Sequence, residues 1–172
     1  ACAQLDDALG LDDRDTAASL DRLAPRVREE LDRLGRLEGR LLARVHGDLH
    51  IGQVLGSPGG FHVVDFEGEP TRPPAERRAL QSPLRDVVSM VRSFEHLARW
   101  HLRDDPDSRR LALALEWAEA ARSGFLEGYA AGATGSRLRV DPLLVRAFEV
   151  EKETYELVYA ARFLPEWTPI AL

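Results

Sequence analysis

The feature that most constrains this chain is a short run of strand-forming residues within a pattern that is otherwise helical. The segments QVLGS and FHVVDF are rich in β-branched residues, and SPGG separates them as a hairpin turn would. The polar stretch HGDLHIGQ at 46–53 precedes this hairpin, and DFEGEP at 65–70 follows it. Because a hairpin brings the segments before and after it to the same end, we expect three polar side chains to lie together: Asp48, Gln53 and Asp65.

Amphipathic helices are expected on both sides of this insert. Leucine and valine recur every three or four positions in the N-terminal segment, which is the spacing of one helix face. Pro25 lies inside that segment, which predicts a kinked helix or two helices. The pairs Ser82-Pro83 and Asp141-Pro142 combine a capping residue with a proline at the first helical position, and so predict helix starts. The expected fold class is α+β and mainly helical, with a helical segment (1–39), a loop and hairpin (40–70) and a helical subdomain (82–164).

Composition narrows the class of protein. The chain has 172 residues, which fits one domain or one large lobe, and it is 44% hydrophobic and 30% charged. Its formal net charge of -6 argues against a nucleic-acid partner, which requires a basic surface. No apolar run is long enough to span a membrane, the N-terminus lacks the features of a signal peptide, and Cys2 is the only cysteine. A cytoplasmic protein without a membrane partner is therefore expected.

The polar residues around the hairpin suit phosphoryl transfer. That reaction uses a carboxylate to orient the attacking hydroxyl, and hard oxygen ligands to hold Mg²⁺ against the phosphates. In protein kinases, the catalytic-loop Asp is followed five residues later by a metal-binding Asn, and then by an Asp-Phe-Gly segment. This chain has the same spacing from Asp48, with Gln53 in place of the Asn and Glu67 in the glycine position.

A family resemblance extends this interpretation. The segments VHGDLHIGQVL, VVDFEGEP and SPLRDVVSMVRSFEHLA resemble the C-terminal lobe of aminoglycoside-phosphotransferase-like sugar kinases, which are protein-kinase-like, and the resemblance covers most of residues 41–167. The Gln of the loop, AERR and the tail YELVYAARFLPEWTPI are most similar to actinobacterial maltokinases. The resemblance implies an ATP-dependent kinase that converts maltose to maltose 1-phosphate, in some members fused to trehalose synthase. The alternatives are glucosamine, another sugar or an aminoglycoside as acceptor, or a non-catalytic sugar-binding or interaction module of a trehalose-pathway enzyme.

The resemblance also implies roles for individual residues. Asp48 would be the catalytic base, and Gln53 and Asp65 would hold Mg²⁺ against ATP. Asp86 would accept hydrogen bonds from the backbone of the catalytic loop, and His46 would pack under that loop. The candidates for contact with the sugar are His50, Glu67, Glu69, Tyr155, Arg162 and Trp167.

The ATP-gripping N-terminal lobe of such kinases is not found in this sequence. Lys152 is the only lysine, and it lies in a predicted helix rather than on a strand. No Gly-rich loop precedes a helix in the way that phosphate binding requires. We therefore expect these 172 residues alone not to turn over ATP.

Simpler interpretations exist for several of these side chains. His46 and His50 have the i, i+4 spacing of zinc ligands on a helix, but glycines surround them and no cysteine or third histidine lies near. Glu67 and Glu69 equally fit a solvated acidic loop, and Asp86 fits a carboxylate that only compensates a helix dipole. Packing is the simpler role for two aromatic residues near the C-terminus, Tyr155 and Trp167.

Overall fold

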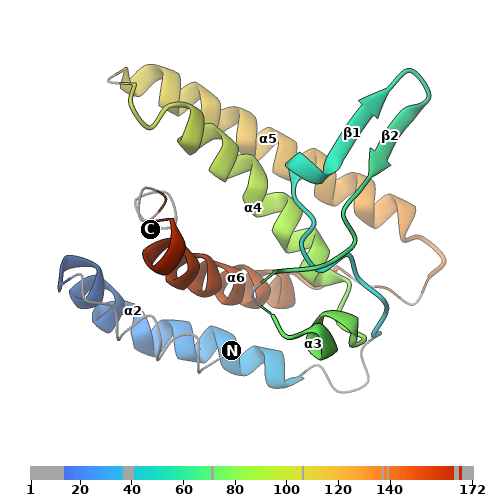
Figure 1. Ribbon diagram of the computed structural model, residues 1–172, viewed down its shortest axis with the longest axis horizontal. Helices are drawn as coiled ribbons and strands as arrows, with labels where there is room; N and C mark the ends of the chain where they lie inside the picture. The colour runs from blue at the N-terminus through green and yellow to red at the C-terminus, as the bar shows by residue number, and fades with distance from the viewer. Residues whose placement is uncertain are drawn as a thin grey trace. The chain divides into compact units, whose positions relative to one another are not determined.

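The computed structural model describes residues 14–36, 41–70, 72–105, 107–136, 138, 140–164 and 167. The chain forms two compact units, one of residues 1–39 and 141–172 and one of residues 40–140. The described elements are mainly helices, with one two-stranded antiparallel sheet, so the predicted α+β, mainly helical class is confirmed (Figure 1). None of the described helices is both long enough and apolar enough to cross a membrane.

The first unit pairs an N-terminal helix with a C-terminal one. Helix α2 (Arg14–Asp32) runs through Pro25 without interruption and is followed by the short 3-10 helix η1 (Arg33–Arg36). Helix α2 packs against α6 (Pro142–Phe163), and Val150 of α6 lies against buried Leu31 of α2. The single helix contradicts the two-helix alternative, because a proline costs a helix one backbone donor without having to end it.

Helix α6 begins where the sequence predicts. The side chain of Asp141 accepts a hydrogen bond from the backbone N–H of Leu143 at 3.0 Å, and Pro142 occupies the first turn. The cap satisfies a donor that the helix itself leaves unpaired, and a proline there loses nothing because its position has no helical partner. Its buried apolar side chains are Leu144, Val145, Ala147, Phe148, Leu157, Val158 and Ala160.

The second unit is built on two long helices that lie side by side, α4 (Leu84–His101) and α5 (Ser108–Gly132) (Figure 1). The ring of Phe94 on α4 meets the rings of Trp117 and Phe125 edge-on, each at 6.2 Å between centroids. Such edge-to-face pairs stabilise a core beyond the area that they bury. Met90 belongs to the same buried cluster, and the residues around the predicted catalytic loop that pack against it are Leu49, Ile51 and Val54.

The predicted hairpin is present. Strand β1 (Val54–Ser57) pairs with β2 (Gly60–Val63) in antiparallel register, and the hydroxyl of Ser57 accepts a hydrogen bond from the Gly59 N–H in the turn. The sequence leads us to expect helices behind the hairpin, since two strands alone are marginal. Among the described contacts, only the start of the hairpin packs against helices. Val54 packs on the α4–α5 core, whereas Phe61 is 84% exposed and the tip stands clear of the helices in Figure 1.

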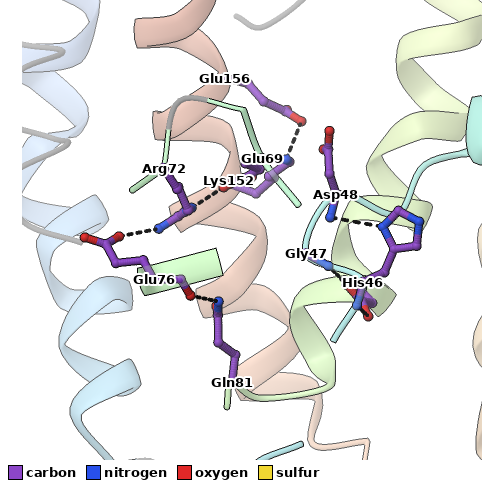
Figure 2. Close-up of polar contacts among 10 residues, drawn as sticks. His46, Gly47, Asp48, Glu69, Arg72, Glu76, Gln81, Lys152 and Glu156 are labelled. Atoms are coloured by element: carbon purple, nitrogen blue, oxygen red, sulfur yellow. Dashed lines mark hydrogen bonds and ion pairs between the residues drawn. The ribbon is translucent and has the colours of Figure 1, made fainter. Parts of the chain in front are cut away.

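The proline-rich segment before α4 contains a short helix, α3 (Pro74–Arg78). Backbone hydrogen bonds of 2.9 Å in both directions between Ala43 and Gln81 tie the end of this segment to the chain that enters the catalytic loop. The side-chain amide of Gln81 donates to the carbonyl of Glu76 at 3.1 Å (Figure 2). Helix α3 is therefore connected to the entrance of the site.

An ion-pair cluster on α4 lowers the pKa of Glu95. The carboxylate of Glu95 pairs with Arg92 at 3.1 Å and with Arg99 at 2.7 Å. Burial by itself would raise the pKa of Glu95, but the hydrogen bond from Arg99 and the charges of Arg92, Arg99 and His96 outweigh it and hold that pKa below its ordinary value. The ionised form of this side chain is thus favoured in the folded protein.

Replacement of Glu95 by Gln should remove part of the acid sensitivity of the fold. A lowered folded-state pKa contributes stability above the unfolded-state pKa, and that stability is lost as pH falls through the folded-state value. Between about pH 6 and about pH 3, the parent should lose up to about 1 kcal/mol more unfolding free energy than Glu95→Gln, as measured by urea titration. The matched control is Glu119→Gln on the exposed side of α5, which should follow the parent; equal curves for the parent and Glu95→Gln would contradict the prediction.

Candidate functional site

The predicted catalytic loop (residues 46–53) is anchored to the first turn of α4 by one carboxylate. Asp86 accepts hydrogen bonds from the backbone N–H of His46 at 2.7 Å and from that of Gly47 at 2.9 Å, one on each oxygen. Hydrogen bonds to an ionised acceptor are stronger than neutral ones. Burial raises the pKa of the Tyr129 phenol on α5, and the nearby charge of Asp86 raises it further. The phenol of Tyr129 is therefore kept neutral near Asp86.

His46 connects the two halves of the site through its ring. The backbone N–H of Asp48 lies 3.3 Å from Nδ1, and Nε2 lies 2.7 Å from the carbonyl oxygen of Val64. Because a backbone N–H only donates and a carbonyl only accepts, Nδ1 must be the acceptor and Nε2 must carry the proton. The ring of His46 is therefore neutral and bridges the catalytic loop to the residue that precedes Asp65. It is 6% exposed and packs against the ring of Phe66 at 4.7 Å between centroids.

Two glycines allow the catalytic loop to approach the segment after the hairpin. Gly47 has φ +86 and Gly68 has φ +76, which are both left-handed conformations that side chains with a Cβ rarely adopt. A Cβ built on Gly47 would lie 3.2 Å from the Cα of Gly68. A side chain on residue 47 would therefore crowd the backbone of Gly68, and glycine at position 47 avoids this.

A second side chain of α4 holds the loop further along. The hydroxyl of Ser93 accepts a hydrogen bond from the backbone N–H of Ile51 at 3.0 Å and donates to the carbonyl of Met90 at 2.7 Å. Asp86 and Ser93 are seven residues apart, which is two helical turns, so they lie on one face of α4. We did not predict a role for Ser93; the signal was a polar residue two turns after Asp86 in an otherwise apolar stripe.

Gln53 and Asp65 meet at the base of the hairpin, as hairpin closure predicts. The amide Nε2 of Gln53 donates to Oδ2 of Asp65 at 3.0 Å, and the backbone N–H of Val64 donates to the carbonyl of Gln53, also at 3.0 Å. Asp65 has φ +64, and it is the only residue other than glycine with a positive φ in the part of the chain that the structure describes. Such backbone strain is concentrated at functional sites.

The donor set at this point suits Mg²⁺. Among the described residues, no three His, Cys, Asp or Glu side chains gather as a ready-made metal cage. An amide oxygen and a carboxylate are hard ligands of the kind that Mg²⁺ takes when phosphates and water complete its shell. Gln53 and Asp65 provide that pair. A zinc site built on His46 and His50 is excluded by geometry, because both Nδ1 atoms accept backbone hydrogen bonds and His46 Nε2 is used by Val64.

Asp48 is half-buried on the same loop. In Figure 2 its backbone N–H faces the His46 ring while its carboxylate extends away from that ring. The hydrogen bond to His46 therefore holds Asp48 through its backbone, and the Asp48 carboxylate lies on the side that faces away from the His46 ring.

Two of the three sugar-contact candidates of the loop region have local side-chain partners. The Nδ1 atom of His50 accepts from the Gly52 N–H at 3.1 Å and caps the short 3-10 helix η2 (Ile51–Gln53). Glu69 is 5% exposed and its carboxylate pairs with Arg72. Glu67 is exposed.

The other three sugar-contact candidates belong to the unit of residues 1–39 and 141–172. The ring of Tyr155 stacks on that of Tyr159 at 6.2 Å, and Lys152 Nζ lies 5.2 Å from its centroid. Arg162 is exposed at the end of α6, and the backbone N–H of Trp167 donates to the Leu164 carbonyl at 2.8 Å.

Replacement of Asp86 by Asn should loosen the catalytic loop. Asn offers only one acceptor oxygen, so one of the two backbone N–H groups would face an NH₂ group instead of a carboxylate oxygen. We expect a loss of about 1–3 kcal/mol of unfolding free energy and faster hydrogen exchange at the amides of His46 and Gly47. Asp104→Asn is the control, because Asp104 is 86% exposed beyond the end of α4. If Asp86→Asn matches Asp104→Asn in both measurements, Asp86 only compensates the helix dipole.

Known proteins similar to this chain are glucosamine kinases. No protein-family model matches the chain. It is 38% identical over 148 residues to a glucosamine kinase of Streptacidiphilus jiangxiensis, covering 84% of this chain and 33% of that protein. It is 37% identical over 137 residues to a glucosamine kinase of Mycolicibacterium smegmatis, covering 78% of this chain and 34% of that protein. The chain therefore spans about a third of the length of these curated relatives.

Solved structures show the same fold. A glucosamine kinase in complex with glucosamine, ADP and inorganic phosphate superposes with a TM-score of 0.89 at 33% identity, covering 98% of this chain and 43% of that chain. A crystal form of glucosamine kinase gives the same TM-score and covers 99% of this chain. The arrangement of the described elements is thus one that a kinase of this kind contains.

These comparisons correct the expected identity of the relatives. The predicted similarity to maltokinases, and with it maltose as the acceptor, is wrong, because the relatives found at 33–38% identity are glucosamine kinases. The physical reason is that the prediction was based on HGDLHIGQ and DFEGEP, whose residue types suit phosphoryl transfer, a reaction that sugar kinases share whatever their acceptor. The relatives also give no support to a fused trehalose synthase.

Proposed function

We propose that this chain is the catalytic-loop part of an ATP-dependent glucosamine kinase. The proposed acceptor of the phosphoryl group is glucosamine, one of the alternatives to maltose that the sequence predicts. The observation that carries the chemistry is the 3.0 Å contact between Gln53 and Asp65 beside the loop that holds Asp48. The choice of sugar is supported by 38% identity to a glucosamine kinase over 84% of the chain.

The reaction transfers the γ-phosphoryl group of ATP to a hydroxyl of the sugar. The hydroxyl oxygen forms a bond to the γ-phosphorus, the bond from that phosphorus to the β–γ bridging oxygen breaks, and ADP leaves. Asp48 orients the hydroxyl and accepts its proton. Because phosphoryl transfer has a loose transition state, most of the catalysis comes from position and charge. The hydrogen bonds of Asp86 and His46 supply position by fixing the main chain just before Asp48 and at the Asp48 N–H itself.

Gln53 and Asp65 would hold Mg²⁺ through the amide oxygen and the carboxylate. The bound ion neutralises charge on the phosphate oxygens. The residue before Asp65 is tied to the catalytic loop through the His46 ring and through the Gln53 carbonyl. The metal-binding segment and the proton acceptor are therefore held as one unit, which keeps the phosphate and the hydroxyl in register.

For the sugar, an acidic contact is the main requirement. Glucosamine carries an ammonium group at neutral pH, and carboxylates are its strongest hydrogen-bond partners. Glu67 is exposed two residues after Asp65, whereas the carboxylate of Glu69 is engaged by Arg72, so Glu67 is the better candidate of the two. His50, in the same unit as Glu67, is a further proposed sugar contact.

Replacement of Asp48 by Asn should remove the proton acceptor while keeping the shape of the loop. In the full-length protein we expect kcat to fall by about 10²–10⁴-fold with little change in the KM for glucosamine, as measured by coupled ADP release. Asp32→Asn, at an exposed position of α2, is the control and should keep full activity. Turnover of Asp48→Asn within a few-fold of the parent would rule out Asp48 as the base.

The acceptor is tested by comparing sugars in the same assay. We expect kcat/KM for glucosamine to exceed that for maltose by at least about 100-fold, because a site built for an ammonium group leaves buried polar groups unpaired when the group is missing. Calorimetry with each sugar in the presence of ADP gives an independent ranking. A preference for maltose in both measurements would refute glucosamine as the substrate and leave the phosphotransferase chemistry standing.

A further inference from the structure

We propose that Arg77 of α3 is a positioning residue for the metal-binding aspartate, Asp65. This inference rests on the proposed role of Asp65 in holding Mg²⁺. The guanidinium Nη1 of Arg77 donates to the backbone carbonyl of Glu67 at 3.1 Å. Arg77 is thus bonded to the main chain two residues after Asp65, although it reaches there from ten residues further along the chain.

The stem of Arg77 packs under the same segment. A Cβ built on Gly68 would lie 3.5 Å from Cβ, Cγ and Cδ of Arg77, so the aliphatic part of the Arg77 side chain lies alongside Gly68. On its other side, Gly68 Cα lies 3.2 Å from the Cβ position of Gly47. The segment after the hairpin is therefore held between the catalytic loop and Arg77, and the guanidinium of Arg77 adds a hydrogen bond to the carbonyl before Gly68.

The conformation of this segment explains why it needs such support. Asp65 at φ +64 and Gly68 at φ +76 both lie in the left-handed region, and for Asp65 this costs free energy. Strained residues persist only where the surroundings over-determine them. Before Asp65, Val64 is held by Gln53 and His46. After Asp65, the hydrogen bond from Arg77 to Glu67 provides the corresponding restraint.

Arginine is suited to this position because it combines a long apolar stem with a charged donor. The Nε of Arg77 is buried and has no hydrogen-bond partner among the described residues, which is a cost that the rest of the contact must offset. Arg78 differs, since it is exposed at the end of α3. These adjacent arginines therefore give a matched pair of variants.

The test measures metal binding rather than activity alone. In the full-length protein with ADP bound, Mn²⁺ serves as a spectroscopic substitute for Mg²⁺, and its affinity is measured by electron paramagnetic resonance. Arg77→Met keeps most of the stem and removes the donor, so the dissociation constant for Mn²⁺ should rise by about 10-fold or more, as for other outer-shell partners of metal ligands. Arg78→Met should bind Mn²⁺ like the parent.

Two further variants separate the possible outcomes. Arg77→Lys keeps a donor near Glu67 and should recover part of the affinity. If Arg77→Met does not fold, Arg77→Leu, which likewise has no donor, takes its place in the comparison. Asp65→Asn should weaken Mn²⁺ binding if Asp65 is a ligand. If Asp65→Asn weakens binding and both Arg77 variants bind like Arg78→Met, the role of Arg77 is refuted and the proposed function stands. If Asp65→Asn binds Mn²⁺ like the parent, the metal role of Asp65 and the inference on Arg77 both fail.

Discussion

The hydrogen bonds from two consecutive backbone N–H groups to Asp86 are the interaction on which the site depends. They attach His46 and Gly47 to the first turn of α4, which is a rigid helix buried against α5. A carboxylate is favourable there because it lies at the positive end of the helix dipole and accepts charge-assisted bonds. Ser93, two turns later, holds Ile51. The catalytic loop therefore takes its position from one face of one helix.

The neutral ring of His46 connects this anchored loop to the segment after the hairpin. The ring accepts from the Asp48 N–H and donates to the Val64 carbonyl, so Asp48 and the residue before Asp65 share one support. The left-handed conformation of Asp65 is then held by contacts on both sides. The ring acts here as a connector, since the Asp48 N–H needs an unprotonated Nδ1 and the Val64 carbonyl needs a proton on Nε2.

The division between chemistry and specificity explains why maltose was the wrong expectation. The proposed roles of the motif residues concern phosphate, metal and the transferred proton, and these demands are the same for any sugar kinase. Asp48, Gln53 and Asp65 could therefore be proposed from type and spacing. The sugar is selected by residues that have no fixed spacing in the sequence. Two of the predicted sugar contacts illustrate this, because Glu69 pairs with Arg72 and His50 caps η2.

The sequence by itself determined the features that depend on a few neighbouring residues. These are the capped start of α6, the apolar face of α4, the hairpin turn and the meeting of Gln53 with Asp65, which follows from hairpin closure alone. Only the tertiary structure decided that Ser93 would hold Ile51 and that Arg77 would support Gly68. The reason is physical: caps and turns are set by local dihedral angles and hydrogen bonds, whereas contacts between distant residues arise only once apolar faces have packed and brought their backbones together.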